Sequence, residues 1–126
     1  KRLYFVTAPG EAIRYSIAVG KVGAGWSGVK HVAQMDVEPA WAAPDALRKD
    51  KSVPATVIPG GASNNPMGAR AIGLGPEKEY GIHGTNQEYL LDDTTRYYSH
   101  GCTRNYNENI LWLWPRVPVG TPVMPW

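Results

Sequence analysis

The run Ser-His-Gly-Cys-Thr-Arg at residues 99–104 contains the only cysteine of this chain, Cys102, and a histidine–glycine pair at His83 and Gly84 precedes it. A thiol and a nearby imidazole are the catalytic groups of thiol acyl-transfer enzymes, because the thiolate is the nucleophile and the imidazole can take the thiol proton. The polar and basic neighbours of Cys102 favour a thiolate over an inert thiol. We therefore predict that Cys102 is a nucleophile and that His83 is its base or pairs with the thiolate.

The cysteine also has two interpretations that involve no catalysis. A single cysteine in a small protein often behaves as a buried, small apolar residue, but serine, histidine and arginine neighbours do not make an apolar pocket. A metal site built from Cys102, His100 and His83 would lack a fourth ligand and the C-x2-C spacing of structural zinc, and His31 has no metal-binding neighbours. We therefore expect no metal and no cofactor.

Length and composition narrow the class of protein. A chain of 126 residues predicts one domain, residues 1–126, with a single sizeable core. The formal net charge is only +2, and basic residues are not interleaved with aromatic ones, so no nucleic-acid partner is expected. No stretch approaches the roughly 18 apolar residues of a transmembrane segment. Residues 1–6 resemble a strand and not a signal peptide, so the leader of an exported protein would have been removed or never included in this sequence.

Frequent turn residues predict a mostly β protein, because 11 prolines and 14 glycines leave few runs long enough for a helix. Short or alternating apolar runs predict five strands, the first two forming a hairpin, at residues 3–6, 13–19, 29–37, 71–74 and 80–85. The irregular segment 38–68 is predicted to be either a wall of a substrate groove or an ordered surface loop with Trp41 against the core. His31 is expected at a strand surface or as a satisfied core histidine.

One short helix is predicted after Cys102. Asn105 or Asn107 would cap its start, and Pro115 would end it. Its buried face would carry Ile110, Leu111 and Trp114. Beyond the helix, the prolines of residues 117–123 are typical of an edge strand, because a central strand needs its backbone N–H groups for pairing.

Strand alternation suggests where the reactive side chains point. If Ile82 faces the core, His83 turns toward a cleft, and Cys102 and Arg104 share one side of their own segment. The start of the following helix would favour a thiolate through its partial positive charge. Gly101 would let backbone N–H groups approach a developing oxyanion.

Together, these motifs resemble the L,D-transpeptidase catalytic domain, the YkuD-type family. The resemblance rests on His83, the fifteen residues that separate it from Ser99, and the Ser-His-Gly-Cys run followed by Arg104. It covers essentially the whole chain, with further matches at residues 65–68, 82–86 and 119–123. It implies a mostly β fold, a YkuD-like β-sandwich of mixed sheets with one short helix after the catalytic cysteine.

The resemblance also implies cysteine-dependent acyl transfer on bacterial peptidoglycan. The cysteine attacks the carbonyl of the third residue of a tetrapeptide stem, a diamino acid, at its L-centre. D-alanine leaves, and an amine takes the acyl group. Carried onto this sequence, Cys102 is the nucleophile, His83 is the general base, and the Gly84 carbonyl orients the histidine.

The remaining site residues are assigned by the same resemblance. Ser99, His100 and Gly101 would shape the oxyanion and substrate-binding region, and Arg104 would face the substrate or brace the site. The implied partners are peptidoglycan stem peptides, and the implied location is the periplasm or cell envelope of a bacterium.

Several alternatives stay open at this point. The acceptor is a stem peptide, a D-amino acid or an outer-membrane protein, and the oligomeric state and the roles of segments 38–68 and 87–98 are not indicated. Water as the acceptor would make the protein an L,D-carboxypeptidase or another hydrolase. A non-catalytic peptidoglycan-binding module is a third reading, against which the intact Cys102 and its two histidines argue.

Overall fold

The structure, a computed structural model, describes residues 1–20, 25–49, 53–76, 80–92, 97–99 and 101–125. Its strands are β1 (Arg2–Ala8), β2 (Glu11–Gly20), β3 (Lys30–Val37), β4 (Arg70–Gly75), β5 (Tyr80–His83), β6 (Tyr97–Ser99), β7 (Thr103–Asn105) and β8 (Pro122–Val123). Its helices are α1 (Asp45–Arg48), α2 (Asn107–Leu113) and two 3-10 turns, η1 (Glu88–Asp92) and η2 (Trp114–Arg116).

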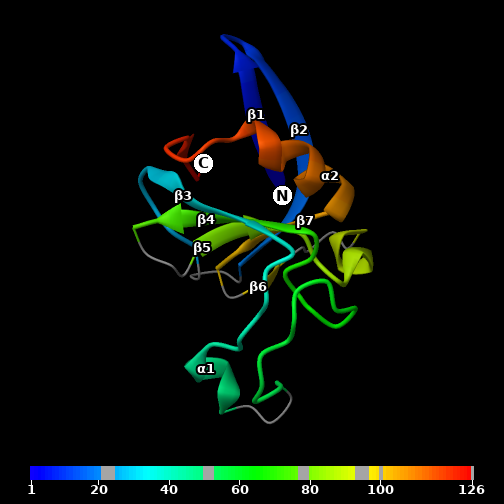
Figure 1. Cartoon of the computed structure of the whole chain (residues 1–126). Helices are drawn as coiled ribbons and strands as arrows, with labels where there is room; N and C mark the ends of the chain where they lie inside the picture. The colour runs from blue at the N-terminus through cyan, green and yellow to red at the C-terminus, as the bar shows by residue number, and fades with distance from the viewer. Residues whose placement is uncertain (21–24, 50–52, 77–79, 93–96, 100, 126) are drawn as a thin grey trace.

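Backbone hydrogen bonds join the strands into one mixed, eight-stranded sheet in the order β1-β2-β7-β5-β4-β3-β8, with β6 beside β2. The β5–β7 and β2–β6 pairs are parallel, and the other pairs are antiparallel. In Figure 1 the β1–β2 hairpin extends to one side of the molecule and the loop that carries α1 extends to the other. The prediction of a mostly β fold with mixed pairing and a short helix after the cysteine is confirmed.

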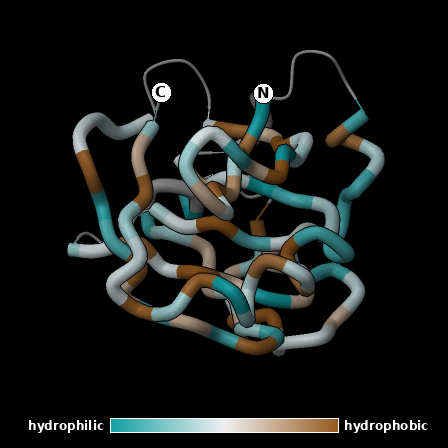
Figure 2. The backbone as a smooth tube through the Cα atoms, turned by 90° about the horizontal axis from the view of Figure 1, so that it is seen from above, coloured by the Kyte–Doolittle hydropathy of each residue, from teal (hydrophilic) through white to brown (hydrophobic). Residues whose placement is uncertain are grey.

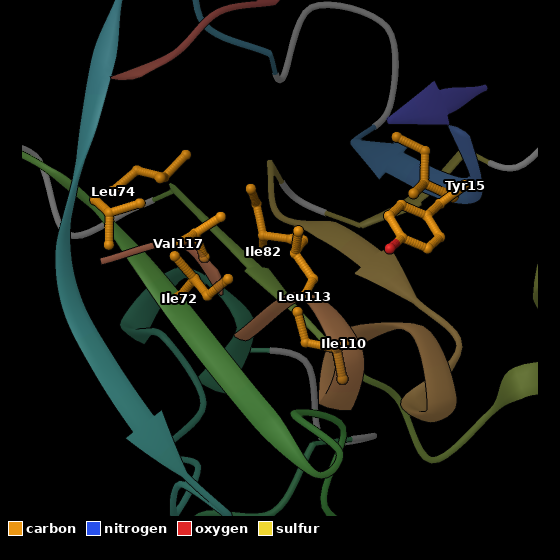
Figure 3. Packing of buried hydrophobic residues seen from close by; sticks show 9 residues of the cluster. Tyr15, Ile72, Leu74, Ile82, Ile110, Leu113 and Val117 are labelled. Atoms are coloured by element: carbon orange, nitrogen blue, oxygen red, sulfur yellow. The ribbon is translucent and has the colours of Figure 1, made fainter. Parts of the chain in front are cut away.

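The core lies between the sheet and α2. Ile72 of β4 and Ile82 of β5 are Cα partners, and α2 contributes Ile110 and Leu113; all four are at most 5% exposed. Figure 3 shows these side chains facing one another between the strands and the helix. Burial of each contributes about 1.5–3 kcal/mol. The remaining members of the cluster are Tyr15, Ile17, Val32, Leu74 and Val117.

Short apolar stretches, not long ones, supply this core. Figure 2 shows brown, apolar positions interrupted at short intervals by teal, polar ones along the chain. That pattern fits strands with one face in the core and the other face outside it. The predicted hairpin of β1 and β2 is present as an antiparallel pair, and His31 is exposed on β3, as a strand-surface histidine would be.

The helix after the cysteine forms as predicted, but its buried face differs from the expected one. Ile110 and Leu113 face the core, Trp114 is half-buried, and Leu111 is 45% exposed. Positions i and i+3 share a helix face, whereas i and i+1 do not, so Leu111 points away from the sheet.

The predicted cap of this helix is also wrong. The N-cap residue is Tyr106, which makes no side-chain cap hydrogen bond. Instead, the backbone N–H of Asn107 donates to the Glu88 carboxylate at 2.6 Å. Asn105 is fully buried in β7, with no hydrogen-bond partner for its side chain among the described residues. A carboxylate that approaches from η1 therefore takes the place expected for a local asparagine.

The long segment 38–68 has internal order. The buried Asn65 side chain donates to backbone carbonyls of the segment and accepts from the Met67 N–H at 2.9 Å. Trp41 forms an isolated antiparallel bridge with Ile58 and is not part of the core cluster formed by described residues. The segment reaches the cleft described below at Met67, so its last part lines a groove, and a substrate for that groove stays a prediction.

The end of the chain is less regular than predicted. The edge strand expected over residues 117–123 is reduced to β8, which pairs with β3 at the edge of the sheet. Strands β6 and β7, on either side of the cysteine, were not predicted from the sequence. Each has three residues, which is too short for a recognisable apolar alternation.

Candidate active site

Strands β5 and β7 bring the two predicted reactive residues to one face of the sheet. Their parallel pairing sets Ile82 against Thr103 and His83 against Arg104. Ile82 and Thr103 are both buried, and Ile82 belongs to the core, so His83 and Arg104 lie on the opposite face. Cys102 precedes Arg104 by two positions and shares its side, as the sequence predicts.

A cleft of about 370 Å³ lies on this face, and both His83 and Cys102 line it. Gly73 of β4 and Gly81 of β5 are Cα partners that also line the cleft, so its floor carries no side chains at these positions. A Cβ placed on Gly81 would lie 3.9 Å from the Cys102 Sγ. The thiol therefore lies beside a part of the sheet where no side chain covers the backbone, and an extended peptide can approach it there.

His83 is neutral at pH 7 and has a defined orientation. It is 4% exposed, and burial lowers its pKa to about 4, while hydrogen bonds with the Gly84 and Met67 backbones act in the opposite direction. Its Nδ1 lies 2.6 Å from the Gly84 carbonyl oxygen. Because a carbonyl only accepts, Nδ1 carries the proton and donates, which leaves the lone pair on Nε2.

The Cys102 thiol is also neutral at rest. Burial raises its pKa, and a hydrogen bond from the Gly81 backbone and the charge of Arg104 offset this only in part. The expectation that the surroundings favour a resting thiolate is therefore wrong, since desolvation outweighs the positive neighbours. The start of α2, expected to help, already receives the Glu88 carboxylate.

Arg104 supplies a positive charge close to both groups. Its side chain is half-buried, and its charge lowers the pKa of His83 and that of Cys102. Burial lowers the pKa of Arg104 itself, and Cys102 acts in the opposite direction. Its Nε is buried without a hydrogen-bond partner among the described residues, so the guanidinium has hydrogen-bonding capacity left toward the site.

The residues just before the thiol are described in part. Gly101 is buried with φ +139°, a backbone conformation that favours glycine, and so keeps Cβ atoms away from the approach to Cys102. Ser99 ends β6, where its backbone pairs with Gly20 of β2. The side chain of Ser99 and the whole of His100 lie outside the described residues, so their roles stay predictions.

Asn107, predicted as a possible helix cap, instead connects two backbone segments of the site through its side chain. Its Oδ1 accepts from the backbone N–H groups of Ala69 and Thr85 at 3.1 and 3.2 Å, and its Nδ2 donates to the Thr85 carbonyl at 2.7 Å. A Cβ on Gly68 or Gly84 would overlap this side chain. Asn107 thus fastens the chain directly after His83 to the first turn of α2.

Among the residues that the structure describes, no three or more histidine, cysteine, aspartate or glutamate side chains are placed to hold a metal ion. No helix in the same residues has the length and apolar character needed to cross a membrane.

Comparisons with known proteins agree with one another. The family model described as the L,D-transpeptidase catalytic domain, YkuD, matches residues 1–124. ErfK/SrfK of Escherichia coli, assigned as a probable L,D-transpeptidase, is 33% identical over 132 aligned positions, which cover 97% of this chain and 40% of that protein. YqjB of Bacillus subtilis, also assigned to the L,D-transpeptidases, is 41% identical over 71 residues, 53% of this chain and 39% of that protein. The chain spans about two fifths of the length of ErfK/SrfK.

Solved structures share the fold. An L,D-transpeptidase from Mycobacterium smegmatis matches with a TM-score of 0.69 at 16% identity, over 98% of this chain and 52% of that one. The catalytic domain of the E. faecium L,D-transpeptidase, solved acylated by ertapenem, matches with a TM-score of 0.59 at 16% identity, over 94% of this chain and 84% of that one. At such identities, the likeness concerns the fold alone.

Proposed function

The chain belongs to the family of L,D-transpeptidase catalytic domains, and from this premise we propose that residues 1–126 form a domain that transfers acyl groups on bacterial peptidoglycan. The donor is a tetrapeptide stem whose third residue carries the attacked carbonyl, and D-alanine leaves. The observation that supports this most is the shared cleft, in which a half-buried thiol at Cys102 and an imidazole fixed on the Gly84 carbonyl at His83 lie on one face.

In the first half-reaction, the sulfur of Cys102 bonds to the donor carbonyl carbon while Nε2 of His83 takes the thiol proton. Both groups are neutral before the reaction, so the charge pair forms only as the bond forms. The new imidazolium is stabilised by the Gly84 and Met67 backbones, whose hydrogen bonds favour the protonated ring. The imidazolium then gives its proton to the departing D-alanine amine, which leaves a thioester on Cys102.

The developing oxyanion needs donors directly beside the thiol. We assign this task to backbone N–H groups around Gly101, with Ser99 and His100 shaping the pocket. Arg104 supports the same step, because its charge favours a negative sulfur and disfavours premature protonation of His83. In the second half-reaction an acceptor amine attacks the thioester carbon, its proton passes to His83, and the Cys102 thiol is restored.

The acceptor sets the biological outcome. Another stem would give a 3-to-3 cross-link, and an amine of an outer-membrane protein would anchor that protein to the wall. Since the donor is found outside the cytoplasmic membrane, we place the working protein in the periplasm or cell envelope.

The deciding experiment is incubation with a disaccharide tetrapeptide, followed by mass spectrometry of protein and products. We expect an acyl-enzyme at Cys102 that has lost D-alanine, and a cross-linked dimer. Tripeptide without dimer would instead indicate an L,D-carboxypeptidase. Unchanged peptide, together with saturable binding, would overturn the enzyme assignment in favour of a binding module.

A carbapenem offers an independent probe of the same thiol, and one structural neighbour has been solved acylated by ertapenem. We expect a covalent adduct at Cys102 that persists, because ring opening releases no amine comparable to D-alanine. Its formation should accelerate as the thiol ionises. An unmodified mass after prolonged exposure, with the thiol shown by titration to be reduced, would contradict the transpeptidase.

A further inference from the structure

One carboxylate stands in the cleft across the sheet from the thiol. Asp36 of β3 is the Cα partner of Ala71 on β4, and Ala71 is the partner of His83 on β5. Cα partners in neighbouring strands place their side chains on the same face. Asp36 and His83 therefore stand on one side of the sheet, with only the methyl group of Ala71 between them in their row.

The Asp36 carboxylate is held by its neighbour Gln34. The Gln34 Nε2 donates to both carboxylate oxygens, at 3.1 and 2.9 Å, and both residues line the cleft. No lysine or arginine of the described chain forms an ion pair with Asp36. Each carboxylate oxygen keeps a lone pair for a second donor. An ordered, half-buried carboxylate that forms no ion pair with the described residues suits a cationic group of a ligand.

The distance from the thiol to Asp36 matches the length of an amine-bearing side chain on the donor. The Cys102 Sγ lies beside Gly81 of β5, whose row across the sheet reaches Gln34 on β3, and Asp36 lies two residues further along that strand. Two strand spacings and two residue rises put the thiol and Asp36 roughly 12 Å apart. A donor acyl group on this sulfur carries the side chain of the third stem residue. A four-carbon stem spans roughly 6 Å when extended, and the acyl carbon with one ion-pair hydrogen bond of about 2.8 Å covers the rest.

We propose that Asp36, ordered by Gln34, binds the side-chain ammonium group of the third residue of the donor stem; this rests on the proposed function of the cleft. Gly73 and Gly81 leave the path between thiol and carboxylate open for the side chain. The acceptor amine cannot be the group that Asp36 binds, because that amine must reach the thioester carbon beside Cys102. It follows that the cleft selects donors whose side-chain amine is not yet cross-linked.

Two tetrapeptides test the proposal: one with lysine at the third position, and one with norleucine, which removes the amine without adding bulk. Binding is measured on the Cys102→Ala protein, so that no reaction intervenes. We expect the lysine peptide to bind about tenfold more tightly, the range of one charged hydrogen bond at a partly exposed site. Adding Asp36→Asn to this protein should bring the ratio of the two peptide affinities close to one. Glu11→Gln, which removes an equal charge on the β1–β2 hairpin outside the cleft, should keep the ratio.

The second measurement is the rate of acylation of the reactive protein by each peptide alone, followed by intact-protein mass. A matching preference in kcat/KM, lost in Asp36→Asn, supports the donor assignment. Acylation by both peptides at equal rates would overturn the inference and leave the transpeptidase standing. Absence of acylation with the binding preference intact would overturn the transpeptidase and leave the ammonium site standing. A preference that survives Asp36→Asn, or that is seen only in transfer to an acceptor, would overturn the role of Asp36.

Discussion

Strands β4 and β5 have two faces of opposite character. On the core face, Ile72 pairs with Ile82; on the cleft face, one position along, Gly73 pairs with Gly81. The first pair is at most 5% exposed and packs against α2, whereas the second pair lies under the cleft beside the thiol. The same backbone thus stabilises the domain on one side and leaves room for a substrate on the other.

The difference teaches how the site is placed. Side chains of a strand alternate, so a slip of one residue would exchange the two faces. Packing of the isoleucines therefore fixes His83 in the cleft, although His83 itself contributes an unfavourable burial that lowers its pKa to about 4. Stability comes from one face, reactivity from the other, and each can be disturbed separately.

The largest expected effect is on the cleft face, at the nucleophile. Cys102→Ala should reduce acylation by tetrapeptide or carbapenem to background, because no other thiol exists in the chain. Thermal unfolding should change little, since the side chain is small and only half-buried. Intact-protein mass spectrometry checks the adduct; an adduct on the variant would end the assignment.

The next effect concerns the base. His83→Ala should slow acylation by about 10²-fold or more, and it should change the pH dependence. In the unaltered protein, His83 is neutral above pH 4, so the rate should be nearly flat from about pH 5 until the thiol ionises. Without the imidazole only thiolate attacks, and the rate should rise about tenfold per pH unit up to the thiol pKa. A variant with an unchanged, flat profile would show that His83 is not the base.

A matched pair of substitutions separates the two faces directly. Ile82→Ala should cost about 2–4 kcal/mol of unfolding free energy, through lost burial and a cavity. Acylation per folded molecule should stay within about threefold. Gly81→Ala places a methyl group 3.9 Å from the Cys102 Sγ and 3.1 Å from the Ile72 carbonyl oxygen; it should slow acylation about tenfold and change stability less. Chemical denaturation and acylation rates, measured on both variants, show whether stability and reactivity depend on separate faces of the sheet.

The reverse result would break the comparison. If Ile82→Ala lost activity at full stability, or Gly81→Ala lost stability at full activity, the faces would not be separable. Purification at low temperature and a check of folding by circular dichroism keep unfolded protein from being counted as inactive protein.

Local sequence patterns predicted much of this arrangement. Alternation around Ile82 correctly turned His83 into a cleft, and the same logic put Cys102 and Arg104 on one side. Such predictions depend only on residues adjacent in the chain. The parallel pairing of β5 with β7 could not be predicted, because each strand is short and the pairing is between separate segments.

Tertiary effects explain the remaining errors. The thiol pKa is raised by burial, which a list of polar neighbours does not reveal. The cap of α2 comes from Glu88, which no local motif around Asn107 predicts. On β3, the register shifts between Val32 and Gln34; this irregularity turns Asp36 toward the cleft, whereas strict alternation would put it on the face of the buried Val32.

The smallest effect we predict is at Asn107, which acts on the site from a distance. Asn107→Ala removes three hydrogen bonds to the backbones of Ala69 and Thr85. The loss should cost about 1–3 kcal/mol of unfolding free energy. Because Thr85 follows the Gly84 carbonyl that orients His83, acylation should slow several-fold, less than in His83→Ala.

A double-mutant cycle distinguishes this positioning role from a general loss of structure. If Asn107 acts through the orientation of His83, then Asn107→Ala should have no further effect on acylation in a His83→Ala background, because there is no imidazole left to orient. The stability loss should persist in both backgrounds, since the orphaned N–H groups remain. Asn109→Ala, two positions along α2, serves as the control. It should leave the acylation rate unchanged both in the unaltered protein and in the His83→Ala background. An equal slowing by Asn107→Ala with and without His83 would mean that the asparagine supports the cleft as a whole and not the base.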